Sequence, residues 1–149
     1  MKNTKDTELL IIVKKFKRWV RVSGIVKASA ESKNSSLDKN HIRGHRAEEA
    51  VAKLLKQKGY VVFRNIKTQI AEIDVLAISS KKISLIEVKS LDDEWRVFER
   101  ISPQQLDKLR RNLMLFQDFQ KRNPEFELGV YIALVNQLNQ VRVIDVAMD

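Results

Sequence analysis

The feature that most constrains this chain is an apolar hairpin that contains four charged residues. The segment AEIDVLAISSKKISLIEVKS, residues 71–90, has two apolar stretches joined by a short polar turn. Strands this apolar are normally buried on both faces of a sheet. Burying a charge is costly unless the charge is paired or binds a metal. The four charged residues, Glu72, Asp74, Glu87 and Lys89, therefore need an explanation.

A two-residue turn at Ser80-Lys81 would fix which residues of the two strands face each other. Asp74 would then lie opposite Glu87, and Glu72 opposite Lys89. Because side chains alternate along a strand, all four would point to one face. Further along, that face would carry the aliphatic residues Leu76, Ile78, Ile83 and Leu85, and the other face would carry Ile73, Val75, Ile86 and Val88.

The pairing of Asp74 with Glu87 predicts a metal site. Like charges directly opposite in a hairpin destabilise it, and a divalent cation would remove that repulsion. Carboxylate oxygens suit Mg²⁺ or Mn²⁺, and the backbone carbonyl of Val88 is a further candidate ligand. Lys89 could orient a water molecule, or help deprotonate it, for attack on a phosphodiester. The pattern predicts metal-assisted hydrolysis.

A simpler interpretation needs no metal. Glu72 could form an ion pair with Lys89, and Asp74 could pair with an arginine, at a solvent-exposed end of the hairpin. Both interpretations are compatible with the residues of the hairpin alone.

Two helices are expected to bring further side chains to the site. In the helix predicted for residues 43–60, Glu48 shares a face with Val51 and Leu55 and should point to the core as a metal-binding or catalytic acid. Its alternative role is to favour the helix dipole. In the helix predicted for residues 102–120, Gln105 lies near the core boundary. It could hold a phosphate or the attacking water, or it could be an ordinary helix-flank amide.

The order of the remaining patterns predicts one mixed α/β domain at residues 41–149, with a sheet covered by helices. Gly59 is expected to end the first helix, and Ser102 to cap the second. The expected strands cover residues 60–65, the two arms of the hairpin, 128–135 and 140–148; residues 91–100 read as a polar, irregular segment. Residues 1–40 are a basic amphipathic leader and a polar linker.

The charge distribution points to a polyanionic partner. The net charge is +9, and residues 1–46 hold 12 Lys or Arg and 4 Asp or Glu. The helix expected at residues 7–22 could pack on the domain, contact DNA or lie on an anionic membrane surface; the first two are favoured. Its apolar run is too short for membrane insertion. The absence of cysteine excludes disulfides and thiolate metal sites, and it suits the cytoplasm.

Several basic and aromatic residues are candidates for contact with nucleic acid. Phosphate contacts supply most non-specific affinity for DNA. The candidates are Arg43, Arg46, Lys108 and Arg111, with Arg96, Arg100, Arg110 and a stacking or covering Trp95 as further options. His41 and His45, placed in the basic stretch before the first helix, are expected to contact phosphate or to have no role.

The acid at position 74 followed by Glu87-x-Lys89 resembles the PD-(D/E)XK nuclease signature. More closely, residues 43–147 resemble the YraN-like family of small, endonuclease-like bacterial proteins, through RAEEAVAKLLKQKGYVVFRN, AEIDVLA and IEVKS. Archaeal Holliday junction resolvases look like more distant relatives. Two glycines of the family pattern are replaced by Ala47 and Ala71.

The resemblance implies a restriction-endonuclease-like fold, with a mixed central sheet flanked by helices. It implies that Glu48, Asp74 and Glu87 bind Mg²⁺ or Mn²⁺, that Lys89 assists the nucleophile and that Glu72 is accessory. The leading hypothesis is a metal-dependent DNA endonuclease, acting on structured or branched DNA. Two alternatives stay open: a non-catalytic DNA-binding protein that retains the fold, and a membrane-surface adaptor. A homodimer is expected if the target must be cut on both strands.

Overall fold

The computed structural model describes residues 4–23, 26–27, 39–68, 70–91 and 102–146. These residues form the helices α1 (Thr4–Ser23), α2 (Lys39–Gln57) and α4 (Pro103–Arg122). They also form the strands β1 (Val26–Lys27), β2 (Val61–Lys67), β3 (Glu72–Ile78), β4 (Lys82–Ser90), β5 (Glu127–Val135) and β6 (Val141–Asp145). Among these helices, none is long and apolar enough to cross a membrane.

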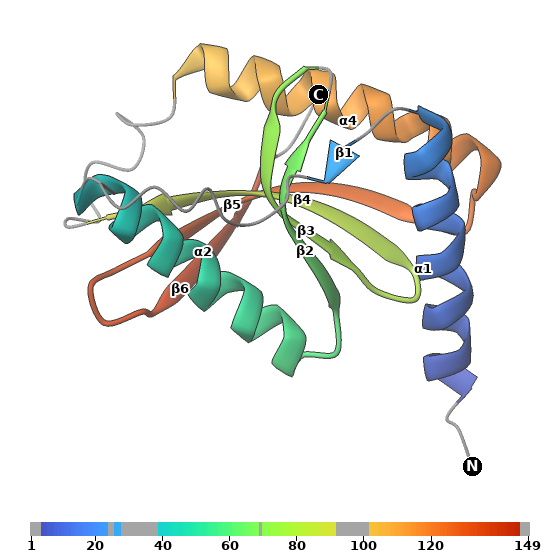
Figure 1. The fold of residues 1–149 in the computed structure, drawn as a ribbon, viewed down its shortest axis with the longest axis horizontal. Coiled ribbons are helices and arrows are strands. Elements are labelled where there is room, and N and C mark those ends of the chain that lie inside the picture. Colours follow the sequence, from blue (N-terminus) through green and yellow to red (C-terminus); the bar gives the residue numbers. More distant parts are fainter. Residues whose placement is uncertain (1–3, 24–25, 28–38, 69, 92–101, 147–149) are drawn as a thin grey trace.

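The strands make one mixed sheet in the order of the chain, β1-β2-β3-β4-β5-β6 (Figure 1). Every neighbouring pair is antiparallel except β4 and β5, which are parallel. A parallel connection needs a crossover, and α4 lies in the chain between these two strands. Helices α2 and α4 pack in separate hydrophobic clusters, on the two sides of the sheet. The predicted mixed sheet flanked by helices is confirmed.

The hairpin has the predicted register. Ile78 pairs with Ile83, and Val75 pairs with Ile86. The backbone N–H of Ser79 donates to the carbonyl of Lys82 at 2.8 Å, which closes the turn around the two residues between them. Extending the same register places Asp74 across from Glu87.

One detail of the predicted faces is wrong. Val75 packs with α2, as expected for its face, but Ile73 packs in the other cluster, with residues of α1 and α4. Regular alternation would put both side chains on the same face. The alternation therefore breaks around Asp74, the residue between them.

Helix α2 begins earlier than predicted. It starts at Lys39, so His41 and His45 lie within the helix rather than before it. Gly59 follows its end with a φ of +89°, the left-handed conformation expected at that position. Among the described non-glycine residues, only Asn65 and Asn139 have a positive φ, so Ala47 and Ala71 occupy positions that do not require glycine.

Helix α4 begins with the predicted cap. The Ser102 hydroxyl accepts a hydrogen bond from the Gln105 backbone N–H at 3.2 Å, and the Gln105 side chain accepts one from the Ser102 N–H at 3.3 Å. This reciprocal pair is a capping box. The helix ends at Arg122, and Asn123 caps it directly before Pro124.

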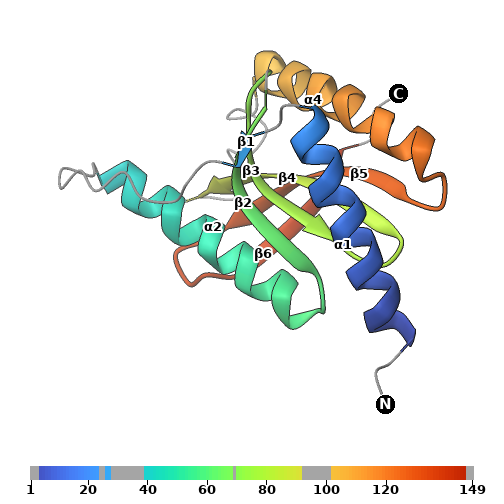
Figure 2. The ribbon, with the colours of Figure 1, turned by 45° about the vertical axis from the view of Figure 1, so that its right-hand side comes forward.

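Helix α1 packs on the core. Phe16 and Trp19 are only 2% and 6% exposed. The Phe16 ring stacks on Phe116 and meets Phe119 edge-on, both in α4, and it also contacts Phe63 of β2. The packing interpretation of the leader helix is confirmed: Figure 1 and Figure 2 both show α1 beside α4, and Figure 1 shows it steeply inclined to α4. Strand β1, which pairs with β2 after α1, was not predicted.

Four of the predicted features lie wholly or mostly outside the described residues. Most of the predicted linker falls in residues 28–38, and Trp95, Arg96 and Arg100 fall in residues 92–101.

Candidate functional site

Asp74 and Glu87 meet at the end of the hairpin. The two carboxyl groups lie close enough for each to influence the pKa of the other. Asp74 Oδ2 also accepts the backbone N–H of Val88 at 2.9 Å. The last cross-strand pair before them is Val75 with Ile86, so the strands part there and a backbone N–H of β4 turns to the Asp74 carboxylate. The structure thus brings together the two acids that the register predicted.

Lys89 lies beside this pair. Its Nζ is 3.4 Å from Glu87 Oε1, and both side chains are about four-fifths buried, at 22% and 20% exposed. The simpler interpretation paired Lys89 with Glu72 instead. Glu72 is exposed at the start of β3, on the rim of the cluster. Lys89 is therefore paired with Glu87 and not with Glu72.

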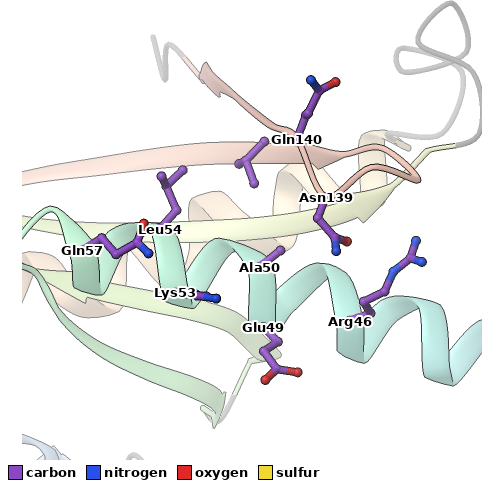
Figure 3. Close-up of a pocket in the computed structure, with 9 residues that line it drawn as sticks. Arg46, Glu49, Ala50, Lys53, Leu54, Gln57, Asn139 and Gln140 are labelled. Carbon is purple, nitrogen blue, oxygen red and sulfur yellow. The ribbon is translucent and has the colours of Figure 1, made fainter.

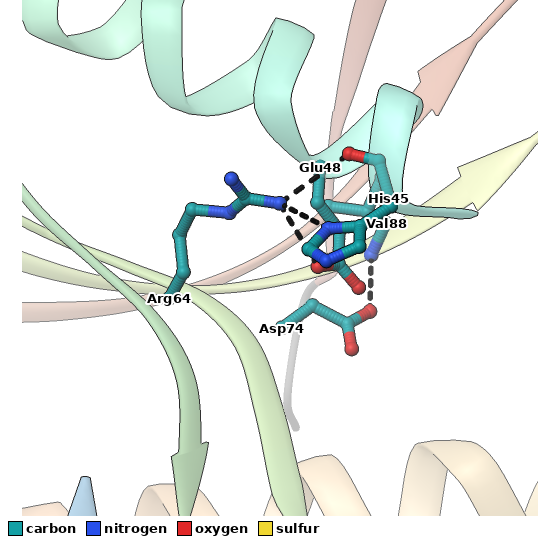
Figure 4. A network of polar contacts seen from close by, with 5 residues as sticks. All are labelled: His45, Glu48, Arg64, Asp74 and Val88. Carbon is teal, nitrogen blue, oxygen red and sulfur yellow. Dashed lines mark hydrogen bonds and ion pairs between the residues drawn. The ribbon is translucent and has the colours of Figure 1, made fainter. Parts of the chain in front are cut away.

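Glu48 reaches the same cluster from α2. Its side chain is 17% exposed, and Arg64 of β2 lies 3.4 Å from its Oε2 (Figure 4). The same Arg64 nitrogen contacts His45 Nδ1 at 2.9 Å and the His45 carbonyl at 3.3 Å. A guanidinium can only donate, so Nδ1 is the acceptor and the imidazole proton is on Nε2. Arg64 was not predicted as a site residue, and its Nε is buried without a partner in the described structure.

Asn65 is a second residue that the sequence analysis missed. It lies across from Asp74, between the pairs Arg64–Val75 and Ile66–Ile73. Its φ of 52° is left-handed, a conformation that asparagine tolerates better than most residues. With its amide oriented toward its acceptors, the nitrogen is 3.1 Å from Glu48 Oε2 and 3.3 Å from a Glu72 oxygen. The sequence did contain a signal for this residue, because an asparagine inside an otherwise apolar strand is unusual.

Burial and mutual repulsion disfavour the charged forms of the acids. Burial, then the charge of Asp74, raises the pKa of Glu48 to about 7, against the opposing effect of Arg64. Burial and Asp74 likewise raise the pKa of Glu87 to about 7, although Lys89 opposes this. Burial raises the pKa of Asp74, while the Val88 N–H acts in the opposite direction. The surroundings of the three acids therefore favour their neutral forms.

The donor set suits a hard cation held by few protein ligands. In the described part of the chain, no three His, Cys, Asp or Glu side chains are arranged to hold a metal by themselves. Mg²⁺ is usually bound through one or two carboxylates, with waters and substrate phosphates completing its octahedron. Asp74 and Glu87 match that requirement, because they are neighbouring carboxyl groups whose mutual repulsion a cation would remove. Glu48 is engaged by Arg64 instead.

The sequence of the chain matches a known protein family. The sequence profile of the nuclease-related domain family matches residues 43–142. The chain belongs to this family. The match includes α2, the hairpin with Asp74, Glu87 and Lys89, and α4. The helix α1 precedes it.

Relatives of this nuclease-related domain are found in distant bacteria. A UPF0102 protein of Campylobacter jejuni is 25% identical over 103 residues, which cover 68% of this chain and 91% of the relative. A UPF0102 protein of Thermotoga maritima is 35% identical over 71 residues, 47% of this chain and 66% of the relative. These matches agree with the YraN-like, restriction-endonuclease-like resemblance seen in the motifs, which is confirmed.

The other predicted residues of the nuclease-related domain lie away from the acid cluster or have other partners. Gln105 is held by the capping box. Arg111 pairs with Asp107 at 3.0 Å on the surface of α4, and Lys108 is exposed there. Arg43 and Arg46 lie along α2. Their contact with nucleic acid stays a prediction.

A groove of about 660 Å³ lies between α2 and the β5–β6 turn (Figure 3). Residues of α2 and of the β5–β6 turn line it: Arg46, Glu49, Ala50, Lys53, Leu54, Gln57, Asn139, Gln140 and Val141. Neither the acid pair nor Lys89 is among them. The groove does not belong to the cluster described above.

Proposed function

We propose that this nuclease-related domain hydrolyses phosphodiester bonds in DNA with Mg²⁺ or Mn²⁺ as cofactor. The observation that carries the proposal is that Asp74, which accepts the Val88 N–H, lies beside the ion pair of Glu87 and Lys89 at the point where β3 and β4 part. Two neighbouring, largely buried acids are an unfavourable arrangement for stability alone. They become favourable when a cation and a phosphate complete the site.

Each residue has a role in this proposal. Asp74 and Glu87 hold the cation, with the Val88 carbonyl as a further ligand. The cation supplies Lewis-acid activation of a bound water and charge stabilisation at the phosphate. Lys89 orients the attacking water and balances the charge that develops on phosphorus. Glu48, held by Arg64, and the rim residue Glu72 orient waters around the site.

The alternative function is DNA binding without cleavage. It retains the fold but gives no reason for three half-buried acids, since carboxylates repel the phosphates that a binding protein must attract. Branched or flapped DNA as the preferred target, a homodimer and a cytoplasmic location are further parts of the proposal, the last supported by the lack of cysteine.

Cleavage assays with the full chain test the proposal. Plasmid, single-stranded, flapped and branched DNA would be incubated with the protein in Mg²⁺ or Mn²⁺. Asp74→Ala and Lys89→Ala should each lower the cleavage rate by about 100-fold or more, the usual contribution of a group that moves protons or holds the reacting water. Binding of DNA should persist in both variants.

Exposed residues on α2 provide matched controls. Glu49→Ala removes an acid next to Glu48, and Lys53→Ala removes a cation, both outside the cluster. These variants should cleave like the wild type. Binding without cleavage in every metal, by a correctly folded wild type, would favour the non-catalytic alternative.

A further inference from the structure

Helix α1 has an inner face that is part of the core and an outer face that carries cations. Phe16 and Trp19 fill the inner face, and the Trp19 Nε1–H donates to Asp118 of α4 at 3.2 Å. Five ring contacts join these two residues to Phe63, Phe116 and Phe119, all with centroids 5.1–6.1 Å apart. These contacts fix which side of the helix faces outward.

The outer face concentrates positive charge. Lys14, Lys17 and Arg18 are exposed, as is Lys15, which makes one long ion pair of 4.0 Å with Glu125. At 100° per residue, Lys14 and Arg18 project almost directly away from Phe16, and Lys17 flanks them. Residues 1–46 carry nearly all of the net charge of the chain, with 12 Lys or Arg against 4 Asp or Glu. Packing of Phe16 and Trp19 does not require this basic surface.

We propose that the outer face of α1, formed by Lys14, Lys17 and Arg18, is a docking surface for the phosphate backbone of duplex DNA. The proposal rests on the proposed DNA substrate and adds a contact that lies outside the matched nuclease-related domain, residues 43–142. Clustered Lys and Arg on one face of a helix give sequence-independent affinity by neutralising phosphates and releasing counterions.

The burial of the aromatic residues favours DNA over a lipid surface. An amphipathic helix binds a bilayer by inserting its bulky apolar side chains. In α1 those side chains, Phe16 and Trp19, are in the protein core. Leu10 and Ile11 are each half exposed, but two isolated aliphatic residues among lysines form no apolar face.

A short series of contacts links α1 to the acid cluster. Phe16 contacts Phe63 of β2, and the next residue along β2, Arg64, contacts Glu48. Because side chains alternate along a strand, the side chains of Phe63 and Arg64 point to opposite faces of the sheet. Duplex DNA held on α1 would therefore be held at a fixed position relative to the acid cluster.

The salt dependence of DNA binding tests the proposal. Full-length protein carrying Asp74→Ala, which prevents cleavage, would be titrated onto a fluorescent duplex at several salt concentrations. Adding Lys14→Gln, Lys17→Gln and Arg18→Gln together should reduce the slope of log K against log salt by about 2–3, since each phosphate contact contributes about 0.9. Lys53→Gln, Lys56→Gln and Lys58→Gln, three exposed lysines around the end of α2, remove the same charge and should leave the slope unchanged.

The outcomes separate this proposal from the proposed cleavage. An unchanged slope in the α1 variant, or an equal loss in the α2 control, overturns the docking surface even if the wild type cleaves DNA. A reduced slope confined to the α1 variant supports docking even if the wild type proves unable to cleave. Wild type that binds phosphatidylserine vesicles through α1 but not DNA also overturns it. Unchanged circular dichroism and thermal unfolding confirm that the variants are folded.

Discussion

Arg64 joins two residues, His45 and Glu48, to strand β2, and no pattern in the sequence indicated these contacts. One guanidinium nitrogen contacts the His45 ring, the His45 carbonyl and the Glu48 carboxylate. Arg64 and Glu48 are 27% and 17% exposed, so their attraction is only partly screened by water. At the scale of single residues, Arg64 determines how Glu48 is presented to the acid pair.

Replacing Arg64 should therefore have a pH-dependent cost. The pKa of Glu48 is about 7, so at about pH 8 Arg64→Ala leaves a half-buried carboxylate without its cation. We expect the free energy of unfolding to fall by about 1–2 kcal/mol there, and by less near pH 5, where Glu48 is protonated and needs no partner. Urea unfolding at both pH values measures this. Arg64→Lys keeps the charge and should lose less; equal losses of stability at both pH values would contradict the explanation.

At the scale of elements, the sequence predicted local structure well and tertiary contacts less well. The hairpin register, the Ser102 cap and the stop at Gly59 each depend on a few neighbouring residues, and all are confirmed. Strand β1 has two residues, too few for an alternating pattern. Nor could alternation predict the side occupied by Ile73, because alternation breaks at Asp74, opposite the left-handed Asn65 of β2.

The candidate site shows the same difference: residues set by local sequence were predicted, and residues set by tertiary contacts were not. The register of the hairpin predicts that Asp74, Glu87 and Lys89 lie together. Helical spacing predicts that Glu48 points to the core. Arg64 and Asn65 lie on β2, and their roles depend on where β2 places them relative to α2 and Glu72. The amphipathic pattern of α1 likewise revealed a buried face but not the α4 aromatics that cover it.

The aromatic contacts of α1 predict that this helix is needed for the stability of the fold. Phe16 is 2% exposed and touches four other rings, so Phe16→Ala removes a buried side chain and leaves a cavity. We expect a loss of about 3–5 kcal/mol in the free energy of unfolding. Leu10→Ala, at a half-exposed position of the same helix, should change it by about 0.5 kcal/mol or less. A small effect of Phe16→Ala in denaturant unfolding would mean that α1 packs only loosely.

At the scale of the whole molecule, the acid cluster links folding to protons and to cations. The pKa values of Glu48 and Glu87 are both raised from 4.5 to about 7 in the folded protein. Between these values the folded state binds more protons than the unfolded state, so stability should fall as the pH rises from about 4.5 to 7 and then level off. The Glu87→Gln variant removes one of these groups and should flatten the curve, whereas the exposed control Glu49→Gln should not.

Divalent cations should reverse this loss, because they favour the ionised acids that the folded protein otherwise disfavours. Mg²⁺ or Mn²⁺ at ten times its dissociation constant should add about 1.4 kcal/mol to the free energy of unfolding near pH 8. Near pH 5 the gain should be much smaller, since protons then occupy Glu87 and compete with the cation. Thermal unfolding with and without metal at both pH values measures the difference. An equal gain in Asp74→Ala would show that the cation binds elsewhere, and the pairing of Asp74 with Glu87 would then need another explanation.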